Sequence, residues 1–177
     1  MRVFIGNYPK GNKERPVRVK IDKWDTWSMD HTLALIIHPM LIQLKEQKHG
    51  SPYTDDDEVP EHLRSTAAPP KENEYDTDAN HEARWDWMLD EMIWAFGTMI
   101  DDNDTQHYYV PYGPDEVVEP FMVTTLKEDG TEEEEEFMGV EEVRNMGRVD
   151  EEKRRAYMDR KHNALILFGK HFQSLWS

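Results

Sequence analysis

The sequence of 177 residues contains no cysteine. This absence excludes disulfide bonds, thiolate catalysis and every zinc or iron–sulfur site that uses cysteine ligands. The sequence also lacks any apolar run approaching the roughly 20 residues of a membrane span, and its first residues lack the apolar stretch of a signal peptide. These absences predict a soluble, intracellular protein.

Three motifs of common enzyme chemistry are missing as well. The sequence contains no P-loop, no glycine-rich dinucleotide-binding pattern and no nucleophile elbow. Nucleotide-dependent and hydride-transfer chemistry are therefore poor hypotheses, and the sequence predicts no cofactor of these kinds.

Basic residues are scarce relative to acidic ones. The chain has 21 Lys and Arg against 37 Asp and Glu, which gives a formal net charge of −16, although residues 1–50 hold nine basic and only five acidic residues. An acidic surface repels duplex nucleic acids and anionic membranes. We therefore expect a protein partner, either a second copy or a basic protein, although such charge also serves solubility alone.

The composition nevertheless favours a folded core, because 37% of the residues are hydrophobic and six are tryptophan. The length predicts a single domain over 1–177. Residues 2–5 and 17–21 alternate in polarity and predict a hairpin or two strands of one small sheet, with Val17, Val19 and Ile21 on a buried face.

Three long segments have helical periodicity. They cover about 28–48, 79–101 and 150–176, and the first is apolar nearly all round, which predicts the central core helix, kinked or divided at Pro39. Residues 51–79 predict a long irregular connection, with one helical turn around 60–64. Residues 118–139 predict an acidic hairpin or loop with a turn at Asp129 and Gly130. The expected fold class is α+β, with three long helices and a small antiparallel sheet or hairpins.

Several segments resemble a family of uncharacterised tailed-bacteriophage proteins, which also occurs in marine viral sequences. The resemblance covers about two thirds of the chain and rests on the tryptophan-rich segments 24–33 and 84–87, together with 48–50, 89–93 and 167–176. The shorter connection between Ile5 and Val17 and the acidic segment 128–136 depart from the family pattern. The resemblance implies a viral protein in the host cytoplasm and no particular activity.

Carboxylates and histidines form the strongest candidate for chemistry. Asp30 and His31 open the first long helix, whereas His81 and Glu91 lie on the second. Such oxygen and imidazole ligands suit a divalent metal between helices, although paired Glu-x-x-His elements are missing. The alternative interpretation gives them helix-capping, ion-pairing and solvated roles.

Trp24 and Trp27 form the candidate for partner binding. They flank the start of the first long helix and could make an aromatic platform, with Arg18, Lys20 and Lys23 nearby for phosphate groups. Packing in the core is the more common role of tryptophans at this spacing.

These observations favour a non-catalytic accessory protein that acts through protein–protein contacts of its acidic surface. Inhibition of a host nucleic-acid-binding protein by charge mimicry is the sharper form of this hypothesis. A small metal-dependent enzyme that uses Asp30, His31, His81 and Glu91 is the alternative, and a divalent metal is the one cofactor it needs.

Overall fold

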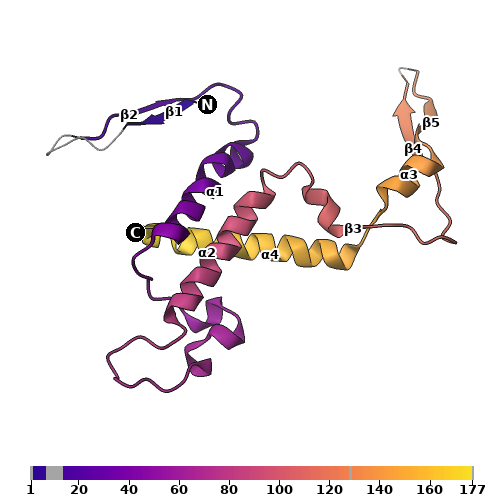
Figure 1. Ribbon diagram of the computed structural model, residues 1–177. Helices are drawn as coiled ribbons and strands as arrows, with labels where there is room; N and C mark the ends of the chain where they lie inside the picture. The colour runs from indigo at the N-terminus through magenta and orange to yellow at the C-terminus, as the bar shows by residue number, and fades with distance from the viewer. Residues whose placement is uncertain (1, 7–13, 128, 177) are drawn as a thin grey trace. The chain divides into compact units, whose positions relative to one another are not determined.

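The computed structural model describes residues 2–6, 14–127 and 129–176 and has the predicted α+β fold (Figure 1). The chain divides into two compact units. The first unit contains residues 1–102 and 161–177, and the second contains residues 103–160.

The described residues form four α-helices and three two-stranded antiparallel sheets. The helices are α1 (Met29–Gln47), α2 (His81–Thr98), α3 (Val140–Met146) and α4 (Glu151–Lys170). The paired strands are β1 (Arg2–Ile5) with β2 (Val17–Lys20), β3 (Tyr109–Val110) with β6 (Arg148–Val149), and β4 (Phe121–Leu126) with β5 (Glu132–Met138). None of the described helices has the length and hydrophobicity that crossing a membrane requires.

Helix α2 is the centre of the core in the first unit. It contains nine buried residues, and Trp85, Met88, Leu89 and Met92 are almost completely enclosed. The sequence predicts α1 for this role, and that prediction is wrong, because α1 buries only Ala34 and Leu41. Apolar side chains lie around most of α1, so the sequence pattern does not identify which side of the helix is buried. Much of the apolar surface of α1 is exposed.

Helices α1 and α2 run antiparallel and cross closely. The first turn of α1 contacts the end of α2 through His31, whereas Lys45, near the end of α1, pairs with Asp90. A Cβ atom at Gly97 would lie 3.2 Å from Nε2 of His38, so the glycine permits the close approach of the two helices. Pro39 is exposed and lies within one continuous helix.

The segment between α1 and α2 is irregular, as predicted, but packs against the core. It contains the short 3-10 helices η1 (Asp56–Glu58), η2 (Glu61–Leu63) and η3 (Ser65–Ala67). Val59 belongs to the core cluster, and Glu58 binds the end of α4 through Lys170 and His171. The chain ends beyond α4 in η5 (Phe172–Ser174).

In the second unit, strands β3 and β6 join the segments on either side of the β4–β5 hairpin. The 3-10 helix η4 (Asp104–Tyr108) precedes β3, and α3 follows the hairpin. Gly147 has φ +82°, and a Cβ there would lie 2.6 Å from the carbonyl oxygen of Val110. A glycine is required at this point because other residues adopt that backbone conformation at a cost.

Candidate functional site

Both faces of the β1–β2 hairpin are exposed. The register pairs Arg2 with Lys20 and Phe4 with Arg18, so these four side chains share one face, called the basic face here. The opposite face carries Val17 and Val19, which are more than half exposed. The sequence prediction that Val17, Val19 and Ile21 are buried is therefore wrong. Helix α1 and the turn beneath the hairpin leave a hollow of about 320 Å³, lined by Val3, Asp25, Thr32, Leu35 and Ile36.

Trp24 and Trp27, called the aromatic pair here, are exposed on the turn that joins this hairpin to α1. Trp24 is 63% exposed and Trp27 is 84% exposed, and the ring centroids lie 6.5 Å apart in an edge-to-face arrangement. Nζ of Lys23 lies 4.7 Å from the centre of the Trp24 ring. Core packing, the more common role, does not apply to these tryptophans. Their exposure leaves them accessible to a partner.

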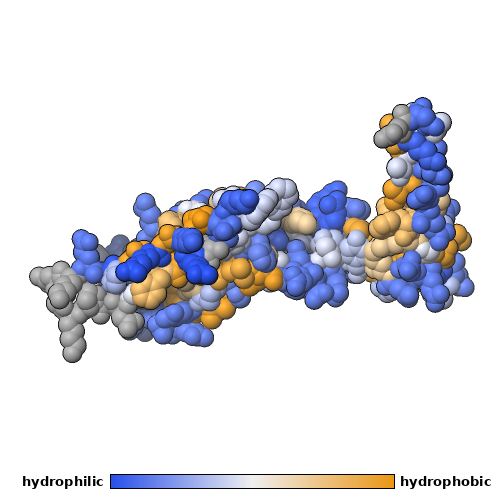
Figure 2. Space-filling model, turned by 90° about the horizontal axis from the view of Figure 1, so that it is seen from above, coloured by the Kyte–Doolittle hydropathy of each residue, from blue (hydrophilic) through white to orange (hydrophobic). Residues whose placement is uncertain are grey.

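The β4–β5 hairpin, called the acidic hairpin here, carries five consecutive glutamates on β5. Met122, Thr124 and Leu126 pair with Glu136, Glu134 and Glu132, so three glutamates share a face. All six residues of β4 are exposed, and the rings of Phe121 and Phe137 contact edge-to-face at 5.9 Å. In Figure 2 the surface of this hairpin, at the right of the view, is mostly hydrophilic, with hydrophobic patches exposed beside it.

The turn of the acidic hairpin fits its sequence. Gly130 has φ +84°, which glycine tolerates, and its N–H donates to the carbonyl oxygen of Lys127. Nζ of Lys127 lies 2.7 Å from a carboxylate oxygen of Glu133, on the face opposite to Glu132, Glu134 and Glu136. In the part of the chain that the structure describes, no ion pair neutralises Glu132, Glu134 or Glu136.

The structure does not bring Asp30, His31, His81 and Glu91 together. His31 Nδ1 lies 2.8 Å from the carbonyl oxygen of Met99, just beyond the end of α2, whereas His81 is the first residue of α2. The helix rise of 1.5 Å per residue separates these ends by about 25 Å. No three His, Asp or Glu side chains in the described ranges are grouped to hold a metal ion. The metal alternative therefore has no ligand cluster in those ranges.

His81 instead belongs to a structural contact. Its Nε2 lies 3.1 Å from the carbonyl oxygen of Ser51, and its ring packs against Tyr53. Nearby, the buried Arg84 guanidinium donates two hydrogen bonds to Asp78, at 2.9 and 2.7 Å, and one to the carbonyl oxygen of Leu63. The two bonds from Arg84 lower the pKa of Asp78, and together with the bond to Leu63 they attach the connection 51–79 to α2. We call the Arg84–Asp78 pair the clamp.

Glu58 makes a second buried contact of the same kind. Its carboxylate oxygens lie 2.9 Å from Nζ of Lys170 and 2.8 Å from Nε2 of His171. Burial favours the neutral carboxyl group, but the hydrogen bonds from Lys170 and His171 outweigh it, and the pKa of Glu58 lies below its ordinary value. The ring of His171 also packs edge-to-face on Trp85 at 5.6 Å. This contact joins the connection, α2 and the end of α4.

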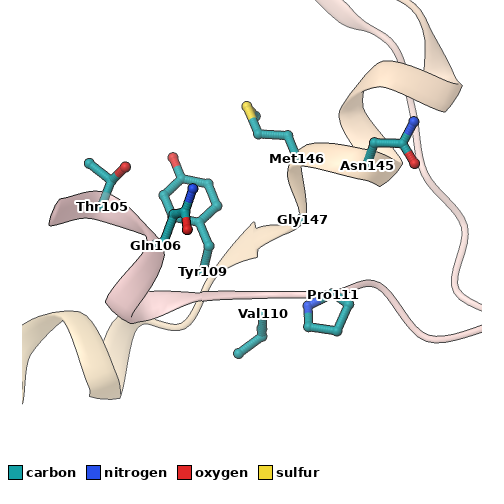
Figure 3. Close-up of a pocket in the computed structure, with 8 residues that line it drawn as sticks. All are labelled: Thr105, Gln106, Tyr109, Val110, Pro111, Asn145, Met146 and Gly147. Atoms are coloured by element: carbon teal, nitrogen blue, oxygen red, sulfur yellow. The ribbon is translucent and has the colours of Figure 1, made fainter. Parts of the chain in front are cut away.

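A hollow in the second unit has a volume of about 510 Å³ (Figure 3). Its lining comprises Thr105, Gln106, Tyr109, Val110, Pro111, Asn145, Met146 and Gly147. It contains amide and hydroxyl groups, but no carboxylate or imidazole to act as a general acid or base near neutral pH. The hollow provides hydrogen-bonding groups rather than the titratable groups of a hydrolytic site.

Comparisons with known proteins give no match for this chain. No family model, no curated protein and no solved structure matches it. The acidic hairpin and the N-terminal surface, which combines the basic face with the aromatic pair, are the candidate functional sites on geometry alone.

Proposed function

We propose that the protein is a protein-interaction module and that its acidic hairpin binds a basic protein surface. The observation that carries this proposal is the face formed by Glu132, Glu134 and Glu136, which make no ion pair within the described chain. Exposed Met122 and Leu126 lie across from them on β4. The charges of one sign on this face would steer and orient a partner of opposite charge, and the apolar side chains would add contact area.

The form of the hairpin supports this proposal. A two-stranded hairpin is marginally stable by itself in water, and repulsion among five adjacent glutamates destabilises it further. A basic partner would neutralise that repulsion and cover the apolar side chains of β4. The acidic hairpin therefore carries an unfavourable charge pattern that binding would relieve.

The spacing of the glutamates supports a nucleic-acid-binding protein of the host as one such partner. Consecutive residues of an antiparallel strand advance about 3.4 Å. The phosphates of one DNA strand advance by about the same distance along the helix axis. Alternate glutamates point to opposite faces, so Glu132, Glu134 and Glu136 advance by about 6.8 Å each, and their face presents one carboxylate for every second phosphate step along the axis. We propose that a basic groove built for phosphates accepts the hairpin, and that DNA competes with it.

Affinity purification from cells that produce the tagged protein tests this function. Three forms are compared: the original sequence, Glu134→Lys with Glu136→Lys, and the control Glu72→Lys with Glu74→Lys, which has the same change in charge in the connection before α2. We expect a basic protein to be retained by the original and control forms, lost from the hairpin variant, and released by added salt or DNA. Equal retention by all three forms contradicts the proposal.

A further inference from the structure

The described structure contains a basic surface that matches the acidic hairpin, and this surface belongs to the chain itself. The basic face places Arg2, Arg18 and Lys20 on one side of a two-stranded sheet, with Phe4 among them. Within the described residues none of these three cations has an ion pair. The basic face therefore offers three cations to three glutamates, and both faces contain exposed apolar side chains.

We infer that a second copy of this chain is a partner of the acidic hairpin, and that its basic face is the contact surface. This inference rests on the proposed function, because it names the partner of the same hairpin. The two sheets have the same form: each has two antiparallel strands, and each exposes its strand edges and faces. Contact between them would pair charges and cover Phe4, Met122 and Leu126.

Local complementarity outweighs net charge at ordinary ionic strength. Two copies carry −16 each and repel at long range. The screening length is about 8 Å at physiological salt, so this repulsion weakens beyond the contact, whereas the apposed hairpins lie within that length. Residues 1–50 carry a net +4, and the second unit carries 17 acidic and seven basic residues. The contact is thus head to tail, between different surfaces of the two copies.

Self-association through these surfaces would also control access to the acidic hairpin. A second copy and a foreign basic protein would compete for Glu132, Glu134 and Glu136. We expect the foreign partner to bind best at protein concentrations where self-association is weak.

Sedimentation measurements on the full chain at several concentrations and salt levels test the inference. We expect particles of more than the 21.0 kDa of one chain at physiological salt, and dissociation to single chains near 1 M salt, where the screening length falls to about 3 Å and the paired charges are screened as well. Two variants carry reversed charges: Arg18→Glu with Lys20→Glu, and Glu134→Lys with Glu136→Lys. Each variant alone is expected to associate on the order of a hundredfold more weakly, because like charges then face each other.

Mixing the two variants is the decisive measurement. The reversed basic face of one variant matches the reversed hairpin of the other, and their unchanged surfaces also match, so association should return in the mixture. This restoration shows that both variants are folded. The control Glu72→Lys with Glu74→Lys should associate like the original protein. A mixture that remains as single chains, or an original chain that never associates, overturns the inference.

The purification described above separates this failure from failure of the proposed function. A chain that stays single but captures a basic protein through Glu134 and Glu136 overturns self-association and keeps the function. A chemical cross-link between the β1–β2 hairpin and the acidic hairpin of the same chain, formed equally at all protein concentrations, also overturns the inference of self-association. The basic face and the acidic hairpin would then bind each other within one chain.

Discussion

Arg84 is the buried cation that attaches the connection 51–79 to α2. Its side chain is 5% exposed and that of Asp78 is 15% exposed. We expect Arg84→Ala to lower the free energy of unfolding by about 3 kcal/mol, because it leaves a largely buried carboxylate without its partner. Urea unfolding gives this difference directly. Arg154→Ala, which removes the exposed pair with Glu151, is the control and should leave the midpoint unchanged.

Glu58 makes stability depend on pH. Its folded pKa lies below the ordinary value of 4.5, so its contribution is complete above about pH 4.5 and is lost as the pH falls through the folded pKa. We expect the urea midpoint to fall between pH 6 and pH 3, and to fall less in Glu58→Gln. Asp78 contributes a decrease with the same sign. Equal decreases in the original and Glu58→Gln forms would contradict the assigned role of Glu58.

Trp27 and Trp85 provide a matched comparison of an exposed and a buried tryptophan. Trp27 is 84% exposed, whereas Trp85 is 1% exposed and packs against His171. We expect Trp85→Ala to lower the free energy of unfolding by about 3–5 kcal/mol, as truncation of a core aromatic does. Trp27→Ala should leave stability unchanged. A large loss of stability in Trp27→Ala would show that this side chain is covered after all.

The short β3–β6 sheet requires the positive φ angle of Gly147 and its close approach to Val110. We expect Gly147→Ala to lower the free energy of unfolding by about 1–3 kcal/mol, because φ is +82° and the new Cβ would meet the carbonyl of Val110. Gly169→Ala is the control within α4, where a Cβ would meet nothing within 4 Å. It should raise stability by about 0.5–1 kcal/mol through helix propensity. Thermal unfolding of the two variants therefore shifts in opposite directions.

The sequence predicts the elements better than the surfaces that they cover. Periodicity locates the three long helices and both longer hairpins, because it depends on local side-chain order. It does not identify α2 as the core helix, since residues 32–44 of α1 are apolar on every side. Nor does it distinguish the exposed Trp24 and Trp27 from Trp85, because exposure depends on which segments far along the chain pack over them.

Across the whole molecule, the distribution of charge along the sequence predicts the acidic hairpin, whereas the spacing of possible metal ligands predicts a site that the described residues do not form. The glutamate run predicts an exposed acidic hairpin because adjacent like charges cannot be buried, and that argument needs no tertiary information. The proposed metal ligands Asp30, His31, His81 and Glu91 lie on two helices, so they could bind one ion only if the packing of those helices placed all four side chains close together. The antiparallel packing of α1 and α2 places His31 and His81 at opposite ends of α2 instead.

The net charge of −16 predicts a reversible, pH-dependent loss of solubility. At the sequence isoelectric point of about 4.8 the net charge vanishes, and chains without net charge associate and precipitate. Glu58 and Asp78 have lowered pKa values and stay ionised at that pH, so the clamp and the contact to α4 persist. We expect turbidity near pH 4.8 that disappears at pH 7, with unchanged circular dichroism in the redissolved protein. The variant Glu72→Lys with Glu74→Lys has a higher isoelectric point, so its turbidity maximum should move to higher pH. Aggregates that do not redissolve at pH 7 would contradict this prediction.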